Sequence, residues 1–420
     1  MISLKYYINC FFKDHTVAGL IKSNKIFFLR SASSTVRREG CNFCYFYELI
    51  LDPMAKSGRL VSLDIFRGMT VAFMIIVNTP GSWKYVYAPL RHASWHGCTP
   101  TDLVFPFFLF IVGVSMWFSM GKYGHELNGS SFLRIARRVL AIFALGLFLN
   151  IFPYFGRDYS TLRIMGVLQR IALAYGIAAL ICLTVDRSYL WIVTAVILLL
   201  YWAALAFGGG NDPYSLEGNL VLKVDQAILG RKHLYTGFGK PFEPEGLLST
   251  IPAVCTVITG YYTGEILGKG KGSKGVFKTL VIGAGLTGLG LLWNKFLPFN
   301  KPLWTSSYVL YSAGLAMVCL GIIYWLADVV KFQIWGRFFL IFGTNALFSF
   351  FIAGIWTKLL LFIKITSGGE KMTLYSFFYE KFFTKVAGNI NGSLLFAIVQ
   401  MLLIWSIGLF LYKKKVFIKL

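Results

Sequence analysis

The side chains best suited to chemistry in this chain lie together in one short segment, residues 77–113. This segment contains Asn78, His92, His96 and Asp102, and it stands between two strongly apolar stretches. A histidine titrates near neutral pH and serves as a general base or a nucleophile, whereas an amide N–H stabilises a developing oxyanion. Polar residues of these types at the edge of a membrane suggest a catalytic site.

The same residues also have structural interpretations. A single interfacial histidine such as His92 commonly contacts lipid headgroups or caps a helix. Asn78 interrupts an apolar run, where its amide either forms an interhelical hydrogen bond or polarises a carbonyl group. Asp102 directly precedes the apolar run LVFPFFLF, so we expect it to cap the next helix, a role that Thr99 or Thr101 could share. Alternatively, Asp102 orients His92 through a ring nitrogen.

Membrane helices must hold these residues, because 56% of the 420 residues are hydrophobic and only 14% are charged. Several apolar runs have the length that about 30 Å of hydrocarbon requires. We therefore predict an all-α fold, a polytopic membrane bundle of about ten transmembrane helices. The predicted spans lie near residues 60–80, 103–121, 136–153, 167–185, 189–207, 248–267, 277–297, 306–327, 338–361 and 394–412.

The net charge of +23 would suggest nucleic-acid binding in a soluble protein. Here many of the lysines and arginines lie in short stretches between apolar runs, where they orient helices and meet anionic lipid headgroups. We therefore predict membrane lipid as a partner and no nucleic acid. Cytoplasmic N- and C-termini satisfy the positive-inside rule at every loop. The outer segments are then residues 81–102, 154–166, 208–247, 298–305 and 362–393, which puts His92 near the outer surface.

Residues 1–55 contain no apolar run of spanning length and no convincing signal-peptide cleavage pattern. We interpret them as a disordered cytoplasmic extension, followed by a transmembrane domain at 56–420. Alternatively the protein starts at Met54, because a short basic leader there runs directly into the first helix. Among seven cysteines, Cys41 and Cys44 form the one C-x-x-C pair, and no second pair or nearby histidine completes a zinc site. We assign no metal.

From about Arg59 to its end, the chain carries a series of motifs in a fixed order. The first two are RLVSLDIFRGMTVAFMIIVN and RHASWHGCTPTDLVFPFFLFIVGVSMWFSM. They are followed by RIMGVLQRIALAY, LVLKVDQAILGRKHLY, FEPEGLLSTIPA, NKPLWTSSYVL and YKKKVFIKL. This series resembles the heparan-alpha-glucosaminide N-acetyltransferase family, membrane enzymes that transfer an acetyl group from cytosolic acetyl-CoA to an amino sugar across the bilayer. We interpret the chain as a bacterial branch, because it shows no counterpart of the animal enzyme's extra luminal domain.

The resemblance implies roles for individual residues. His92 falls on the family's catalytic histidine within H-A-x-W-x-G, and the match favours the functional interpretation of Asn78. His96 stands where a relative has asparagine, which implies a polar lining residue. Asp225 and His233 fall on matching family positions and are candidates for substrate binding.

Other candidates come from residue type and position. Trp95 could stack on a sugar ring, although interfacial aromatic residues usually form a membrane belt, and Asp102 also borders the substrate region. Gln169 and Arg170 lie in an apolar helix and would line a conduit for acetyl-CoA, because an arginine there needs a partner or a cavity. Candidates for binding the phosphates of CoA are the basic cluster Arg134, Arg137 and Arg138 and the loop GKGKGSKG at 268–275. Anchoring by the positive-inside rule explains both without a ligand.

We therefore predict an acyltransferase of the bacterial inner membrane that moves acetyl from cytosolic acetyl-CoA to an amino sugar, with His92 facing the periplasm. His92 acts either as a general base or as a transient acetyl carrier. One alternative is an O-acetyltransferase of a surface or cell-wall glycan. Another is a multi-pass transporter, although the two halves of the chain show no obvious repeat. Relatives of this family suggest a homodimer, and the glycine-rich helix VIGAGLTGLGLL suits close helix packing within or between protomers.

Overall fold

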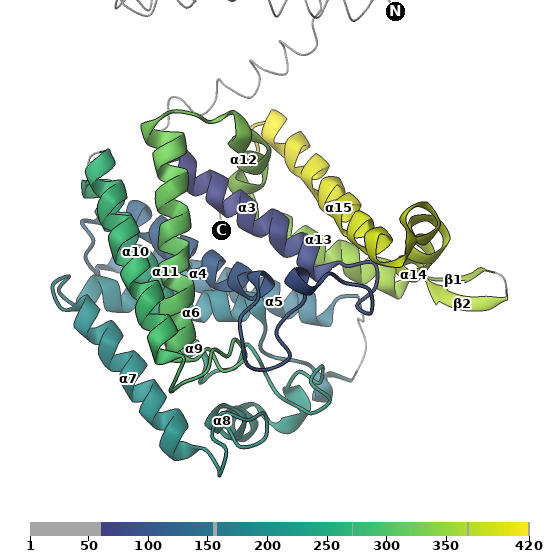
Figure 1. Ribbon diagram of the computed structural model, residues 1–420, viewed down its shortest axis with the longest axis horizontal. Helices are drawn as coiled ribbons and strands as arrows, with labels where there is room; N and C mark the ends of the chain where they lie inside the picture. Colours follow the sequence, from purple (N-terminus) through teal and green to yellow (C-terminus); the bar gives the residue numbers. More distant parts are fainter. Residues whose placement is uncertain (1–59, 154–157, 271, 368, 419–420) are drawn as a thin grey trace, which may run out of the picture. The chain divides into compact units, whose positions relative to one another are not determined.

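The computed structural model describes residues 60–153, 158–270, 272–367 and 369–418, all within the compact unit Arg59–Leu420. The predicted disordered extension at 1–55, the alternative start at Met54 and the Cys41–Cys44 pair lie outside the described residues. The described part is mostly helical, which agrees with the all-α prediction (Figure 1).

The first half of the described chain contains the helices α3 (Val61–Asn78), α4 (Pro100–Met120), α5 (Gly129–Ile151), α6 (Val167–Thr184), α7 (Leu190–Gly208) and α8 (Leu220–Leu229). The second half contains α9 (Thr250–Lys269), α10 (Ser273–Trp293), α11 (Ser306–Tyr324), α12 (Arg337–Thr344), α13 (Ala346–Phe362), α14 (Leu374–Phe378) and α15 (Thr384–Lys413). Between α13 and α14, strands β1 (Lys364–Ser367) and β2 (Glu370–Thr373) form an antiparallel hairpin, which projects beyond α14 in Figure 1.

Every predicted span coincides with a helix or a helix pair, and most of them are apolar enough to cross a bilayer. Within the described ranges, seven helices or helix runs meet that requirement by length and composition: α3, α4, α6, α7, α10, α11 with the π-turn that follows it, and the run from α14 through α15. An eighth span would combine α12 and α13, which meet at a bend of 71°. Helices α5 and α9, with 23 and 20 residues, are also long but do not meet this requirement.

The helix pairs α3–α12, α4–α9 and α10–α11 pack with their backbones in close approach. A Cβ added to Gly113 of α4 would lie 1.9 Å from the carbonyl oxygen of Val257, and one added to Gly260 of α9 would lie 2.0 Å from that of Phe110. Helices α10 and α11 meet similarly, because a Cβ at Gly290 would lie 2.5 Å from the amide nitrogen of Tyr311. Small residues bring membrane helices together in this way. The expectation of close packing for the glycine-rich α10 is confirmed.

A partly buried ion pair lies on α3. The Nη1 atom of Arg67 is 2.6 Å from Oδ1 of Asp64, and its Nη2 atom donates to the hydroxyl of Ser115 at 2.6 Å. Nη1 also donates to the carbonyl oxygen of Gly343. The guanidinium thereby connects α3, α4 and α12. Asp64 and Arg67 can pair because residues three apart lie on the same face of a helix.

We expect Gly260→Leu to destabilise the fold by about 3 kcal/mol or more, because a side chain there would force α4 and α9 apart. The midpoint of thermal unfolding in detergent, followed by size-exclusion chromatography of the remaining monodisperse protein, would measure the effect. Gly285→Leu on α10 is the matched control, since a Cβ at Gly285 has no neighbour within 4 Å. Equal midpoints for the two variants would contradict the proposed backbone contact.

Candidate active site

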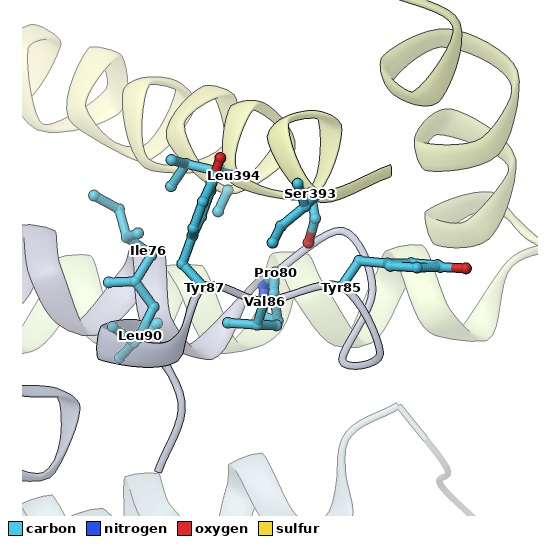
Figure 2. A pocket seen from close by; sticks show the side chains of 11 residues that line it. Ile76, Pro80, Tyr85, Val86, Tyr87, Leu90, Ser393 and Leu394 are labelled. Carbon is cyan, nitrogen blue, oxygen red and sulfur yellow. The ribbon is translucent and has the colours of Figure 1, made fainter. Parts of the chain in front are cut away.

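The segment between α3 and α4 is fixed by helix α15, which lies about 300 residues further along the chain. The amide of Gly81 donates to the carbonyl oxygen of Ser393 at 3.1 Å, and the amide of Ser82 donates to the hydroxyl of Ser393 at 3.1 Å. A Cβ at Gly81 would lie 2.3 Å from the ring of Tyr379, so a glycine is required there. Figure 2 shows Ser393 facing this segment. The chain that leads to His92 is therefore held in place.

His92 and Asp102 form a close pair at the outset of α4. Nδ1 of His92 is 2.6 Å from Oδ1 of Asp102, whose side chain is 3% exposed while that of His92 is 40% exposed. The second carboxylate oxygen accepts the amides of Ala93 and Thr99 at 3.0 and 3.1 Å. Asp102 also forms a capping box with Thr99. Both interpretations of Asp102 are thus correct, because one carboxylate caps the helix and orients the imidazole.

Lys301 completes this group from the loop between α10 and α11. Its Nζ atom is 3.6 Å from Oδ1 of Asp102 and 3.3 Å from Nδ1 of His92. Burial lowers the pKa of Lys301, while the charges of Asp102 and Glu245 act to raise it. Sequence reasoning did not single out Lys301, which lies within the motif NKPLWTSSYVL but is 209 residues from His92.

Two cavities meet at His92. The first, of about 460 Å³, is mainly apolar and is lined by residues of α3, α4 and α13, including Asn78, Phe105 and Phe350. The second, of about 360 Å³, lies among the loops and includes Trp95 and Tyr235. The residues common to both linings are His92, Val167, Glu245 and Lys301. The side chain of His92 can therefore be approached from two sides.

Asn78 ends α3 and lines the first cavity. Its side chain is exposed and has no hydrogen-bond partner among the described residues, so the interhelical hydrogen bond that we considered is not formed. The first cavity also contains Lys358, whose ammonium donates to the carbonyl oxygens of Leu149 and Phe152 at the end of α5. The amide of Asn78 is thus free to bind a ligand atom in this cavity.

The second cavity combines aromatic rings with charged groups. Nε1 of Trp95 donates to the carbonyl oxygen of Tyr214 at 2.8 Å, and its ring meets Phe242 edge-on at 5.3 Å between centroids. Arg163 bonds both Glu243 and Glu245, with Nη2 2.7 Å from Oε2 of Glu245. Burial acts against the charged form of Arg163, but the two glutamates hold its pKa above the usual value.

Arg170 also lines this second cavity and is fully buried. Its guanidinium lies 5.0 Å from the ring centroid of Trp304 and donates to the hydroxyl of Ser249. Its Nε and Nη1 atoms have no hydrogen-bond partner among the described residues. An arginine in an apolar helix needs a cavity or a partner, and Arg170 has a cavity beside it as well as Trp304 and Ser249 as partners.

The other candidates lie outside these two linings. Gln169 donates to the carbonyl oxygen of Ile164, His233 contacts that of Leu162 through Nδ1 at 2.7 Å, and His96 lies 3.4 Å from the side-chain amide of Asn300. Asp225 accepts the backbone amide of Leu247 at 2.9 Å.

The basic cluster lies on the first half of α5. Arg134 and Arg138 extend over the rings of Tyr123 and Tyr175, at 5.7 and 4.6 Å, and Arg137 is exposed. The first cavity lies toward the opposite end of α5, where its lining residue Lys358 bonds Leu149. Leu149 is about 18 Å further along the helix than Arg137, since an α-helix rises about 1.5 Å per residue. Among the described residues, no group of three or more His, Cys, Asp or Glu side chains is arranged to hold a metal.

Comparisons with known proteins identify relatives of this chain. The family model described as "Heparan-alpha-glucosaminide N-acetyltransferase, catalytic" matches residues 59–285. The human protein named heparan-alpha-glucosaminide N-acetyltransferase is 30% identical over 332 residues, which cover 64% of this chain and 49% of the human protein. The mouse protein of the same name is 28% identical over 336 residues, which cover 66% and 50%. The matched region thus spans about half the length of these curated relatives.

Asp225 supports the loop before α9, and its titration yields a stability prediction. Burial raises its pKa from 3.8 to about 6. Because the folded-state value is the higher one, protonation favours the fold: the stabilisation is present below about pH 4 and is lost as the pH rises through about 6. Asp225→Asn removes this dependence. As the pH rises between these values, the free energy of unfolding of the native chain should therefore fall by about 2 kcal/mol relative to that of Asp225→Asn.

Thermal unfolding of the two proteins at pH 4.5 and pH 7, as approximate set points, measures this difference. Asp212→Asn, on an exposed turn, is the control. An unchanged gap between the native chain and Asp225→Asn at both pH values would rule out this role of Asp225.

Proposed function

This chain belongs to the heparan-alpha-glucosaminide N-acetyltransferase family, and from that premise we propose that it transfers the acetyl group of acetyl-CoA to the amine of an amino sugar. The observation that carries the proposal is the His92–Asp102 pair, which lies where two cavities meet. Two substrates that react at one atom require two approaches to it, and the arrangement around His92 provides them.

We propose that the donor reaches His92 from the bundle side and the acceptor from the loop side. The first cavity is apolar and suits the acetyl thioester and its pantetheine arm, whereas the aromatic and charged second cavity suits a sugar. Trp95 would stack on the sugar ring, and Arg170 would bind a polar group of either substrate. The more distant Arg134, Arg137 and Arg138 would meet the phosphates of CoA, and Gln169, Asp225 and His233 would support these sites through their loops.

The proposed chemistry uses Nε2 of His92. Asp102 accepts the hydrogen on Nδ1, which leaves the lone pair on Nε2. In direct transfer, Nε2 takes a proton from the amine as the amine nitrogen attacks the thioester carbonyl carbon. The C–N bond forms, the C–S bond then breaks, and the imidazolium returns the proton to the departing thiolate sulfur. In the alternative, Nε2 itself attacks the carbonyl carbon, the C–S bond breaks, and CoA leaves as its thiolate. The amine then attacks the acetyl-imidazole, the bond between the acetyl carbon and Nε2 breaks, and the proton that the amine loses neutralises the thiolate sulfur.

The topology that we propose has about ten spans, cytoplasmic termini and an outer catalytic end in a bacterial inner membrane. Support comes from the loops that we predicted to be outside. Four of these loop segments contribute residues to the second cavity, so they share one end of the bundle. They are residues 92–102, 163, 235–245 and 301–304. Acetyl-CoA would then arrive from the cytosol, and only the acetyl group would cross. Membrane lipid surrounds such a bundle, and a homodimer is the proposed assembly.

The first test is acetyl transfer from labelled acetyl-CoA to glucosamine by the purified full chain in detergent. We expect His92→Ala to lower the rate at least a thousandfold, since the proton acceptor or acetyl carrier is lost. His96→Ala is the matched control, because His96 lies four residues away and outside both cavity linings. Transfer that persists in His92→Ala would refute this catalytic role.

The same assay separates the alternatives. An acetylated product that is labile to mild base indicates an ester and therefore an O-acetyltransferase. No consumption of acetyl-CoA by folded protein, with amino sugars and hydroxyl-bearing glycans as acceptors, would instead favour a transporter.

Asn78 provides a second prediction for the proposed reaction. Its unpartnered amide would donate to the carbonyl oxygen of the thioester, and this hydrogen bond strengthens as the oxygen becomes an oxyanion. We expect Asn78→Ala to lower kcat by about 10²- to 10³-fold with little change in KM for acetyl-CoA. Thr79→Ser, at the next position, is the control. A rise in KM with unchanged kcat would show that Asn78 binds the ground state only.

A further inference from the structure

Lys301 is held firmly beside the reactive pair. Its side chain is 21% exposed, and the loop that carries it is bonded to the segment around His92 at two points. The side-chain amide of Asn300 donates to the carbonyl oxygen of Trp95 at 3.1 Å, and the amide of Gly97 donates to that of Phe299 at 2.8 Å. The ammonium is thus a fixed charge at the boundary of the two cavities.

Two contacts at Nδ1 of His92 exclude each other. A carboxylate only accepts hydrogen bonds, so the contact with Asp102 at 2.6 Å needs a hydrogen on Nδ1. An ammonium only donates, so a bond from Lys301 at 3.3 Å would need a lone pair on the same atom. The shorter contact goes to the carboxylate. Lys301 therefore acts on His92 as a positive charge, while it pairs with the same carboxylate oxygen at 3.6 Å.

We propose that Lys301 is a positioning residue that keeps His92 neutral, with its hydrogen on Nδ1 and its lone pair on Nε2. This inference rests on the proposed function, in which Nε2 is the reacting atom. With Lys301 present, the group formed by Asp102, Lys301 and neutral His92 has a net charge of zero. Protonation of His92 would add an uncompensated positive charge beside the ammonium, which Coulomb repulsion disfavours.

The charges that face His92 come from several elements. Asp102 belongs to α4, Lys301 to the loop before α11, and Glu245 to the loop before α9. Arg163 and Arg170 lie on the wall of the second cavity, with Arg163 already paired to Glu243 and Glu245. Lys301 is the cation in contact with the imidazole, so its removal changes the balance most. Without it, Asp102 would form an imidazolium–carboxylate pair with His92 over a wider pH range.

The first test measures directly how the reactivity of His92 depends on pH. Diethylpyrocarbonate reacts with neutral imidazole, and peptide mass spectrometry of the full chain measures modification at His92 as a function of pH. We expect the midpoint to move up by about one pH unit in Lys301→Met, which is the lower end of what a charge at contact distance produces. Lys301→Arg should keep the native midpoint. Lys295→Met, an exposed lysine of the same loop, is the matched control.

Acetyl transfer supplies the second readout. The acidic limb of the kcat profile should move up by the same amount in Lys301→Met, so the loss of activity approaches about tenfold below the native midpoint and disappears in alkaline buffer. A uniform loss across pH with an unchanged modification midpoint would overturn the proposal. If Lys301→Met does not fold, Lys301→Gln gives the same test with a polar side chain.

The two proposals fail in different ways. No transfer by the native chain would count against the proposed function, while the modification midpoints would still decide the role of Lys301. Active native enzyme with equal midpoints in all variants would leave the function in place and refute the role of Lys301.

Discussion

The carboxylate of Asp102 is the group around which the site is built. A buried ionised carboxylate is costly unless its oxygens are hydrogen-bonded, and that of Asp102 is 3% exposed. Five groups satisfy it: the amides of Ala93 and Thr99, the hydroxyl of Thr99, the ring of His92 and the ammonium of Lys301. Its place in the first turn of α4 adds the favourable end of the helix dipole. The same carboxylate therefore caps the beginning of a membrane helix and orients the imidazole of His92.

Other segments of the chain fix that arrangement from several directions. Helix α15 anchors the chain at Gly81 and Ser82 through Ser393, and the loop of Asn300 anchors Trp95 and Gly97. Tyr308 of α11 donates its hydroxyl to the backbone carbonyl oxygen of Asp102. These contacts join parts of the chain that are hundreds of residues apart. The loop that carries His92 is long, but few of its degrees of freedom remain, which is the preorganisation that acyl transfer needs.

Local features of the sequence predicted a large part of this structure. The helices of the bundle follow from apolar runs, and Asn78, His92, Trp95 and Asp102 stood out as polar or aromatic residues at the ends of those runs. Both interpretations of Asp102 were visible in advance, because helix capping and imidazole orientation each require a carboxylate at that position.

What the sequence did not predict depends on long-range contacts. Lys301 looks like any charged residue of a short loop, and only the fold brings its Nζ within 3.3 Å of His92. The 71° bend between α12 and α13 was also missed, because RFFLIFGTNALFSF is nearly continuous in its apolar character. There the side chain of Asn345 bonds the backbone of Val416 and Ile418 in the C-terminal segment. A distant partner thus stabilises a break that composition does not signal.

The direction of α4 connects this local chemistry to the proposed transfer across the membrane. Helix α4 begins at the His92–Asp102 pair and continues as an apolar span, packed against α9 through Gly113 and Gly260. In the proposed topology its N-terminus is outside, so charged groups gather at the boundary where loops and water meet the bundle. A base placed there faces an apolar cavity on one side and a polar cavity on the other. An uncharged acetyl group can cross to such a site, whereas the charged parts of donor and acceptor stay on their own sides.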